Sequence, residues 1–130
     1  MLLEAGLYAD RLSVNIEIPT KYGLALLAPE KSHEQLKAPM ETVKEEIITI
    51  RECRKTHKKA PKFTPAGQTS QRIVGASNET DLQVIQLSSH FYKQYDLKRV
   101  YYSGYVPMLS DSRLPAIGTP VPMIRENRLY

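Results

Sequence analysis

The residue types best suited to ligand chemistry in this chain form a short alternating run near its start. Ser13, Asn15 and Glu17 alternate there with apolar residues. Alternate side chains of a β-strand point to opposite faces of its sheet, so the three polar side chains share one face. An amide and a carboxylate two residues apart can accept hydrogen bonds from the vicinal hydroxyl groups of a ligand. The run therefore predicts a strand over residues 11–18 with one packed face and one ligand-binding face.

Two more segments have the composition of strands and end in small or polar residues. They cover residues 71–77 and 99–106. Ligands of parallel α/β proteins bind beyond the carboxyl ends of the strands. Bulky branched side chains normally fill the interior of a barrel. The polar side chains of residues 11–18 differ from such a packed interior. We therefore expect the three strands to border a polar cavity.

Helical patterns separate these strands. Residues 1–9 have the pattern of a helix end, and Pro39 is expected to open the main helix of the chain. Residues 60–70 contain two prolines and a glycine and predict a loop, and Asn78 is expected to cap the next helix. Parallel strands require crossover connections, so the repeated order of helix and strand predicts an α/β fold with a parallel sheet.

The composition is that of an ordinary globular protein. The chain has 130 residues, of which 42% are hydrophobic and 25% are charged. These values match one domain and exclude the disordered class. No apolar run approaches the ~18 residues of a membrane span, and the first residues lack the pattern of a signal peptide. We therefore expect a cytoplasmic protein with no membrane partner.

The chain has a single cysteine, Cys53. One cysteine excludes an internal disulfide bond and cannot by itself hold zinc or an iron–sulfur cluster. Its place in a helical pattern predicts a half-buried helix residue rather than a metal ligand. The sequence therefore contains no framework for a metal site.

A basic segment accounts for much of the net charge of +4. Its members are Arg51, Arg54, Lys55, Lys58, Lys59 and Lys62. One interpretation is a non-catalytic nucleic-acid-binding module over residues 51–62, with DNA as a partner, because such clusters contact phosphates. The other is structural, because acidic residues precede the bases and this order complements the dipole of a helix. Both interpretations stay open at this point.

Three strands make a small sheet with two bare edges. A larger barrel or a partner would cover both edges. Prolines punctuate the chain after residue 106, so we expect residues 107–130 to form a proline-rich loop and the beginning of a helix. We therefore expect residues 1–130 to form a single, incomplete domain.

Three strings of residues resemble the fourth, fifth and sixth strands of radical S-adenosylmethionine (radical SAM) enzymes. They are Ser13-Val-Asn-Ile-Glu-Ile-Pro-Thr20, Gln71-Arg-Ile-Val-Gly-Ala-Ser-Asn-Glu-Thr-Asp81 and Val100-Tyr-Tyr-Ser-Gly-Tyr-Val-Pro107. Within that superfamily the chain is most similar to the DNA modification or repair branch, and more distantly similar to biotin and lipoyl synthases. The resemblance covers nearly the whole chain. It implies the carboxyl-terminal half of a partial TIM-type radical SAM barrel.

The resemblance also implies where the cofactor S-adenosylmethionine binds. In the family, polar side chains at the end of the fourth strand bind its ribose, the fifth strand passes close to its adenine, and the sixth offers backbone groups to the adenine. The corresponding residues here are Ser13, Asn15 and Glu17, then Ile73 and Gly75, and finally Tyr105. Three alternatives stay open: Glu17 pairs with a basic residue of the missing half, Gly75 is a bulge or packing residue, and Tyr105 packs inside the barrel.

The cluster-binding motif of the family, Cys-x-x-x-Cys-x-x-Cys, is absent from the sequence. In the parent enzyme it holds a [4Fe–4S] cluster in the amino-terminal half of the barrel. The implied parent reaction is reductive cleavage of S-adenosylmethionine to a 5′-deoxyadenosyl radical, in DNA modification or repair. Cleavage needs both cofactors, so we expect this chain alone to be inactive. The missing half then comes from the same gene or from a separate subunit.

Overall fold

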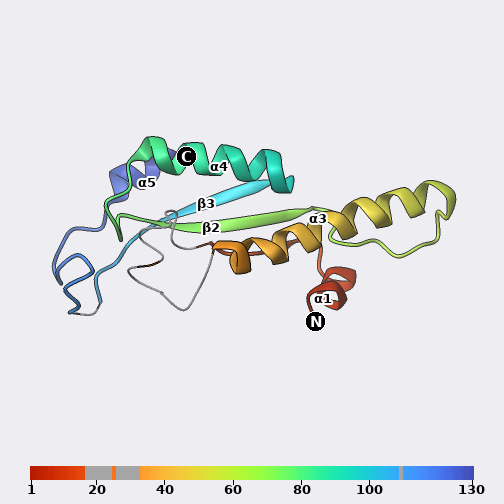
Figure 1. Cartoon of the computed structure of the whole chain (residues 1–130), viewed down its shortest axis with the longest axis horizontal. Coiled ribbons are helices and arrows are strands. Elements are labelled where there is room, and N and C mark those ends of the chain that lie inside the picture. Colours follow the sequence, from red (N-terminus) through yellow and green to blue (C-terminus); the bar gives the residue numbers. More distant parts are fainter. Residues whose placement is uncertain (17–24, 26–32, 109) are drawn as a thin grey trace.

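The computed structural model describes residues 1–16, 25, 33–108 and 110–130 (Figure 1). In chain order, its elements are α1 (Leu2–Tyr8), β1 (Leu12–Ser13), α3 (His33–Thr56), β2 (Gln68–Val74), α4 (Asp81–Tyr95), β3 (Arg99–Gly104) and α5 (Met123–Leu129). Within these parts of the chain, no helix is long and apolar enough to cross a membrane.

The three strands form one parallel sheet in the order β1-β2-β3. Ser13 lies beside Thr69 in this sheet, and Gln71 lies beside Tyr101. The helix α3 lies between β1 and β2 in the chain, and α4 lies between β2 and β3, as parallel strands require. The predicted α/β class with three parallel strands is confirmed. Membership of a larger barrel stays a prediction.

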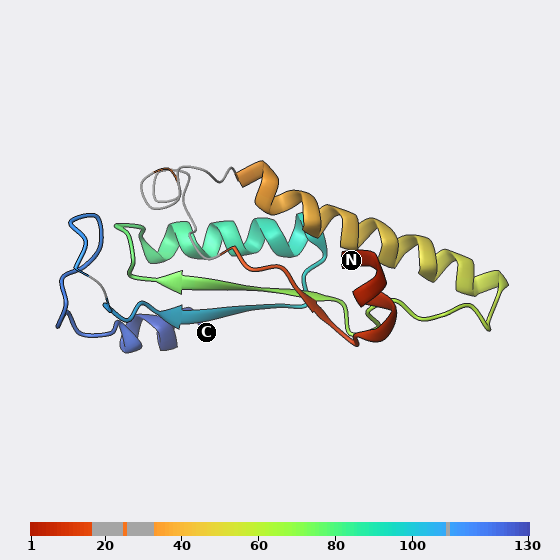
Figure 2. The same cartoon turned by 90° about the horizontal axis from the view of Figure 1, so that it is seen from below.

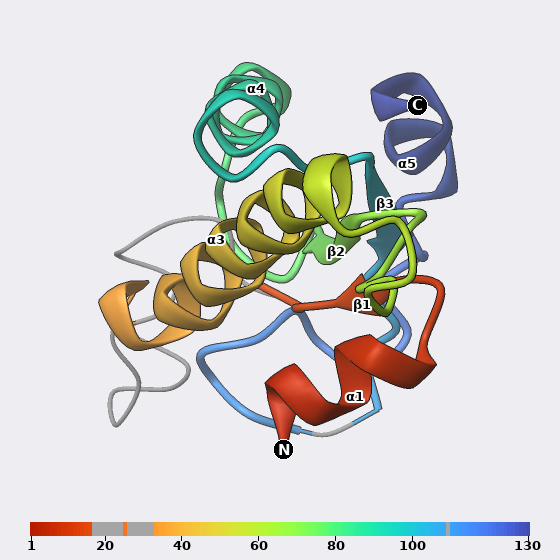
Figure 3. The same ribbon diagram turned by 90° about the vertical axis from the view of Figure 1, so that its right-hand side faces the viewer.

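Helices cover one face of this sheet. Seen along the strands, α3 and α4 lie on the same side of the sheet, and α5 lies beyond β3 (Figure 3). Val74, Val100 and Tyr102 of the strands are buried in one cluster with Val84 and Phe91 of α4. Burial of each such side chain contributes about 1.5–3 kcal/mol, so this cluster holds the helices against the sheet.

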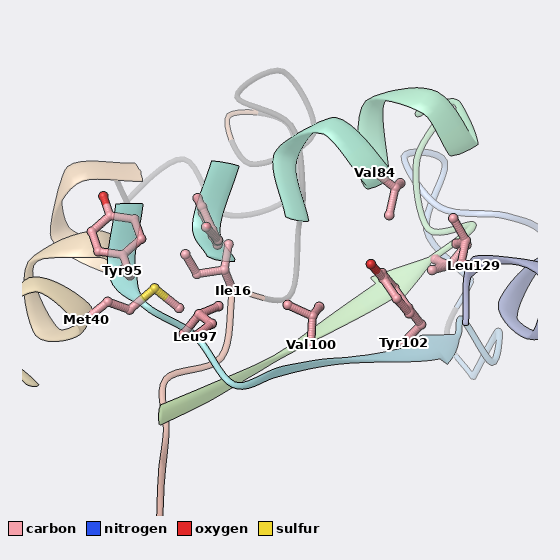
Figure 4. Packing of buried hydrophobic residues seen from close by; sticks show 10 residues of the cluster. Ile16, Met40, Val84, Tyr95, Leu97, Val100, Tyr102 and Leu129 are labelled. Carbon is pink, nitrogen blue, oxygen red and sulfur yellow. The ribbon is translucent and has the colours of Figure 1, made fainter. Parts of the chain in front are cut away.

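The core continues toward both ends of the sheet. Met40, Tyr95 and Leu97 lie at one end of the cluster, and Leu129 of α5 lies at the other (Figure 4). Gln68 is fully buried, and its side-chain amide donates to the backbone oxygens of Met40 at 3.0 Å and Tyr95 at 2.7 Å. These bonds tie the start of β2 to both covering helices.

The first strand is shorter than predicted. The sequence predicts a strand over 11–18, whereas β1 covers only Leu12–Ser13. The parallel ladder still extends one bond further, because the Val14 N–H donates to the Thr69 carbonyl at 3.0 Å. Residues 17–18 lie outside the described residues. The pairing of this strand with β2 is thus seen only in the amino-terminal part of the predicted strand over 11–18.

The second strand is displaced from its predicted position. It covers Gln68–Val74 rather than 71–77, because polar residues before 71 are buried as part of the sheet. It ends before Gly75, whose φ of +86° breaks the extended conformation. The third strand, Arg99–Gly104, closely matches the predicted 99–106.

Three predictions about the helices are wrong. Pro39 lies inside α3 instead of opening it, because its missing N–H removes a single bond near the start of a 24-residue helix. The cap of α4 is Thr80 instead of Asn78, in a capping box with Gln83. Cys53 is exposed rather than half-buried, because the end of α3 extends past the sheet (Figure 2).

The two edges of the sheet differ. Within residues 107–130, α5 lies along β3, where the Tyr130 hydroxyl accepts from the Tyr102 N–H and donates to the Tyr102 carbonyl, both at 3.0 Å. The Glu126 carboxylate accepts from the Gly104 N–H at 2.7 Å. These bonds occupy groups that a fourth strand would use, so the prediction of a bare edge is wrong for β3. At the other edge, no described strand pairs with β1.

Candidate functional site

The sheet face opposite α3 and α4 carries the predicted ligand-binding residues. We call it the open face, and its exposed or half-buried side chains are those of Arg11, Ser13, Asn15, Gln71, Ile73, Arg99, Tyr101, Ser103 and Tyr105. Ile16 is fully buried while Ser13 and Asn15 are exposed, so the predicted alternation is confirmed over this part of the run. Glu17 lies outside the described residues.

The start of the sheet holds Asn15 in a defined orientation. The Ser13 hydroxyl donates to Asn15 Oδ1 at 2.7 Å, and both side chains are exposed on the open face. This bond engages one lone pair of Oδ1. The amide keeps its second lone pair and both N–H donors for another molecule. Ser13 therefore acts as a positioning residue for Asn15.

Ile73 and Tyr105 lie farther along the open face, toward the carboxyl ends of the strands. Both side chains are half-buried, and the Tyr105 N–H extends the ladder by donating to the Val74 carbonyl at 2.9 Å. The register places Ile73 two residues beyond the level of Asn15 on the adjacent strand. Standard strand spacing and rise put their Cα atoms about 8 Å apart. Ile73 therefore lies between Asn15 and Tyr105 on the open face.

Gly75 begins the loop that joins β2 to α4. Its φ of +86° favours glycine, and a Cβ atom there would lie 2.8 Å from Cγ of Pro122. The close approach at this glycine is therefore to its own chain. A groove of about 460 Å³ lies beside the loop, between residues 75–78 and 112–115. Gly75 thus shapes the carboxyl end of β2 by keeping Pro122 close.

A buried carboxylate orders this loop, and the sequence patterns did not single it out as a site residue. Glu79 is 6% exposed. It accepts hydrogen bonds from the Gly75 N–H and the Ser77 hydroxyl, and one of its oxygens lies 3.5 Å from Nη1 of Arg125. Arg125 also donates to the Glu79 carbonyl and to Asp81. The acidic residues at the start of α4 were visible in the sequence, but their partner in α5 was not.

Two guanidinium groups flank Tyr101 on the open face. Nη1 of Arg11 donates to the Tyr101 hydroxyl at 2.9 Å. The guanidinium carbons of Arg11 and Arg99 lie 5.7 and 5.9 Å from the centre of the ring. The hydrogen bond from Arg99, helped by the charge and hydrogen bond of Arg11, holds the pKa of the Tyr101 hydroxyl below its usual value. This part of the open face is therefore positively charged.

The basic segment divides into two groups. One group lines a cavity beside the end of α3 and consists of Arg51, Arg54 and Lys62. The other group is exposed outside this cavity and consists of Lys55, Lys58 and Lys59. Lys98, just before β3, lines the same cavity, although no pattern in the sequence linked it to the segment. The structure thus brings half of the predicted group together with a lysine from another element.

The open face fits an organic ligand better than a metal ion. Its chemistry consists of two amides, hydroxyl groups, an apolar side chain and guanidinium groups. Among the residues that the structure describes, no group of three His, Cys, Asp or Glu side chains is placed to hold a metal ion. No family model, curated protein or solved structure matches this chain. The candidate site is therefore defined by its geometry and by the residues of its strands.

Proposed function

We propose that this chain is the carboxyl-terminal half of a radical SAM barrel and that its open face forms part of the S-adenosylmethionine pocket. The observation that carries the proposal is the division of the sheet into a buried face and a polar face. Parallel sheets are normally covered on both faces. In a barrel, the second face is the interior, and the strands of the other half enclose it.

The edges of the sheet support the same arrangement. Tyr130 and Glu126 already bind the outer backbone groups of β3, so this edge needs no further strand. The edge of β1 has no such partner among the described strands. Strands of the other half would therefore add beside β1. In chain order, they would precede this half.

The residues on the open face fit the ribose and adenine of the cofactor. Asn15, oriented by Ser13, has donors and a lone pair for the two ribose hydroxyl groups. Ile73 presents an apolar surface for the adenine ring, and Gly75 and Tyr105 border that surface at the carboxyl ends of their strands. Ligands of parallel α/β proteins bind at this end.

The rest of the proposal follows from the resemblance. Glu17 is proposed as a second ribose ligand, and the partner half is proposed to hold the [4Fe–4S] cluster. S-adenosylmethionine, when bound, supplies the 5′-deoxyadenosyl group of the parent reaction. DNA modification or repair in the cytoplasm is the proposed setting of the whole enzyme.

The proposal is tested by reassembly of the barrel. The full chain is co-expressed with the amino-terminal half of a radical SAM enzyme of the DNA modification or repair branch, and the cluster is reconstituted without oxygen. We expect the halves to co-purify and to release 5′-deoxyadenosine from S-adenosylmethionine under a chemical reductant. Failure to co-purify would contradict the barrel arrangement.

Two variants distinguish an effect on cofactor binding from an effect on the fold. Asn15→Ala removes the proposed ribose ligand and is expected to raise the KM for S-adenosylmethionine about three- to tenfold, the usual effect of one lost hydrogen-bonding group. Gln86→Ala removes an exposed amide on α4 and is the matched control. Equal KM values for the two variants would show that Asn15 does not bind the cofactor.

A further inference from the structure

A second candidate site lies at the opposite end of the sheet from the proposed pocket. It is a cavity of about 250 Å³ beside the amino-terminal ends of β2 and β3. Its apolar wall consists of Ile47, Ile50 and Phe63. Its cationic side chains are those of Arg51, Arg54, Lys62 and Lys98. The cavity thus combines an apolar wall with a positively charged rim.

The positive charge of this cavity is only partly neutralised. Asp96 also lines the cavity and forms an ion pair with Lys98 at 2.9 Å, but both side chains are about half exposed, so the pair is weak. Arg54 donates to the carbonyl of Ala60 and thereby holds the loop that follows α3. Arg51 and Lys62 are exposed, and the described residues offer them no hydrogen-bond acceptor. An anion at the rim would gain attraction from several cations at once.

A buried donor also lines the cavity. Thr64 is 1% exposed, and its hydroxyl finds no hydrogen-bond partner among the described residues. Backbone bonds hold the residue in place, because its N–H donates to the Gly6 carbonyl at 2.9 Å and its carbonyl accepts from Gly67 at 2.7 Å. An unpartnered buried hydroxyl destabilises the folded protein. A ligand oxygen in the cavity would remove that cost.

We propose that this cavity binds a phosphate group whose attached sugar or base packs against the apolar wall. The cations and the Thr64 hydroxyl all donate hydrogen bonds, and phosphate oxygens only accept them. The phosphate comes either from a nucleic-acid strand or from a free mononucleotide. This inference is independent of the proposed cofactor pocket, because it uses other residues at the other end of the strands.

A purely structural role for these cations explains only part of the arrangement. Bases in the last turn of α3 complement the helix dipole, and Arg54 and Lys55 lie there. Lys62 and Lys98 come from the loop after α3 and from the segment just before β3, where this effect does not apply. Their convergence on one cavity with Arg51 therefore favours a ligand.

The test measures binding of fluorescein-labelled decathymidylate to the full chain by anisotropy. The double variant Arg51→Glu with Lys62→Glu reverses two charges at the cavity. The matched control, Lys58→Glu with Lys59→Glu, reverses two charges in the same segment but outside the cavity. We expect the first variant to lose tenfold or more in affinity and the second to lose about twofold. Equal losses of affinity would overturn the proposal, because they would show that the oligonucleotide binds a diffuse basic surface and not the cavity.

Two further measurements complete the test. Binding of one phosphate of a single strand by Arg51, Lys62 and Lys98 predicts a slope of about −0.7 for log affinity against log salt. Competition by thymidine 5′-monophosphate at concentrations matching the oligonucleotide would identify the free nucleotide as the source, and much weaker competition would identify the strand. Inorganic phosphate is the control competitor, because it lacks the sugar and base that would pack against the apolar wall.

A third variant tests the buried donor without changing charge. Thr64→Val keeps the shape of the side chain and removes its hydroxyl, so we expect about tenfold weaker binding with an unchanged or higher melting temperature. Absence of binding by both the oligonucleotide and the mononucleotide in low salt would overturn the inference. Full affinity of the Thr64→Val protein would show that this hydroxyl does not contact the ligand.

Discussion

Arg72 is a charged residue that is fully buried in the core, and its replacement by methionine should stabilise the protein. The side chain is 0% exposed on the helix-covered side of β2. Its guanidinium carbon lies 4.5 Å from the centre of the Phe91 ring, but none of its nitrogens donates a hydrogen bond within the described structure. Burial lowers the pKa of Arg72 to about 10, and the nearby Tyr102 opposes this change only in part.

The size of the effect follows from this pKa. At about 1.4 kcal/mol for each tenfold change in proton affinity, the buried charge costs about 3 kcal/mol. The cation–π contact with the Phe91 ring offsets about 1–2 kcal/mol of this cost. Methionine fills similar space without a charge, so Arg72→Met should raise the free energy of unfolding by about 1–2 kcal/mol at pH 7. Because the folded state has the lower pKa, the cost is complete below about pH 10 and fades as the pH rises toward the usual pKa of arginine.

Urea denaturation of the full chain measures this change. Arg72→Lys is the control, because it keeps a buried charge but loses the planar stacking on Phe91, and we expect it to be destabilised. A loss of about 3–5 kcal/mol in Arg72→Met would refute the reasoning. That result would show that a carboxylate pairs with Arg72 in the folded protein, since breaking a buried ion pair has this cost.

Three further predictions concern the start of α4. Glu79→Gln should lower the free energy of unfolding by about 3 kcal/mol, because it removes the buried negative charge that faces Arg125; a loss under about 1 kcal/mol in urea would contradict this. Thr80→Ala should lower it by about 1 kcal/mol through loss of the cap, and an unchanged thermal melt would argue against that role. The hydrogen bond from Arg125 lowers the pKa of Asp81 from 3.8, so its contribution is present above pH 3.8 and is lost as the pH falls through the lowered value. The stability difference between wild type and Asp81→Asn should therefore vanish in acid, and a pH series showing a constant difference would exclude the ion pair.

Local patterns predicted the features that depend on neighbours in the sequence. The alternation around Ser13 and Asn15 identified the two faces of β1, because strand geometry alone sets that period. The order of elements predicted the parallel sheet. The prediction of a loop over residues 60–70 was wrong at its end, because Gln68 is a polar residue that is buried by hydrogen bonds to two helices.

Contacts between distant segments were beyond sequence reasoning. Tyr130 binds the backbone of Tyr102, and Arg125 binds Glu79, across separations of 28 and 46 residues. Nothing in the spacing of these residues indicates such pairs. Lys98 likewise joined the basic cavity only through the fold. The candidate sites therefore became complete only when the elements were placed in space.

The central claim is that the open face forms part of an S-adenosylmethionine pocket, and the most direct test is a titration of the full chain with this molecule, followed by amide chemical shifts. Because half of the pocket is supplied by the partner, we predict weak saturable binding, on the order of 1 mM. The shifts should be confined to residues around Asn15, Ile73 and Tyr105. The absence of shifts at these positions, or shifts centred on Lys98 instead, would contradict the account.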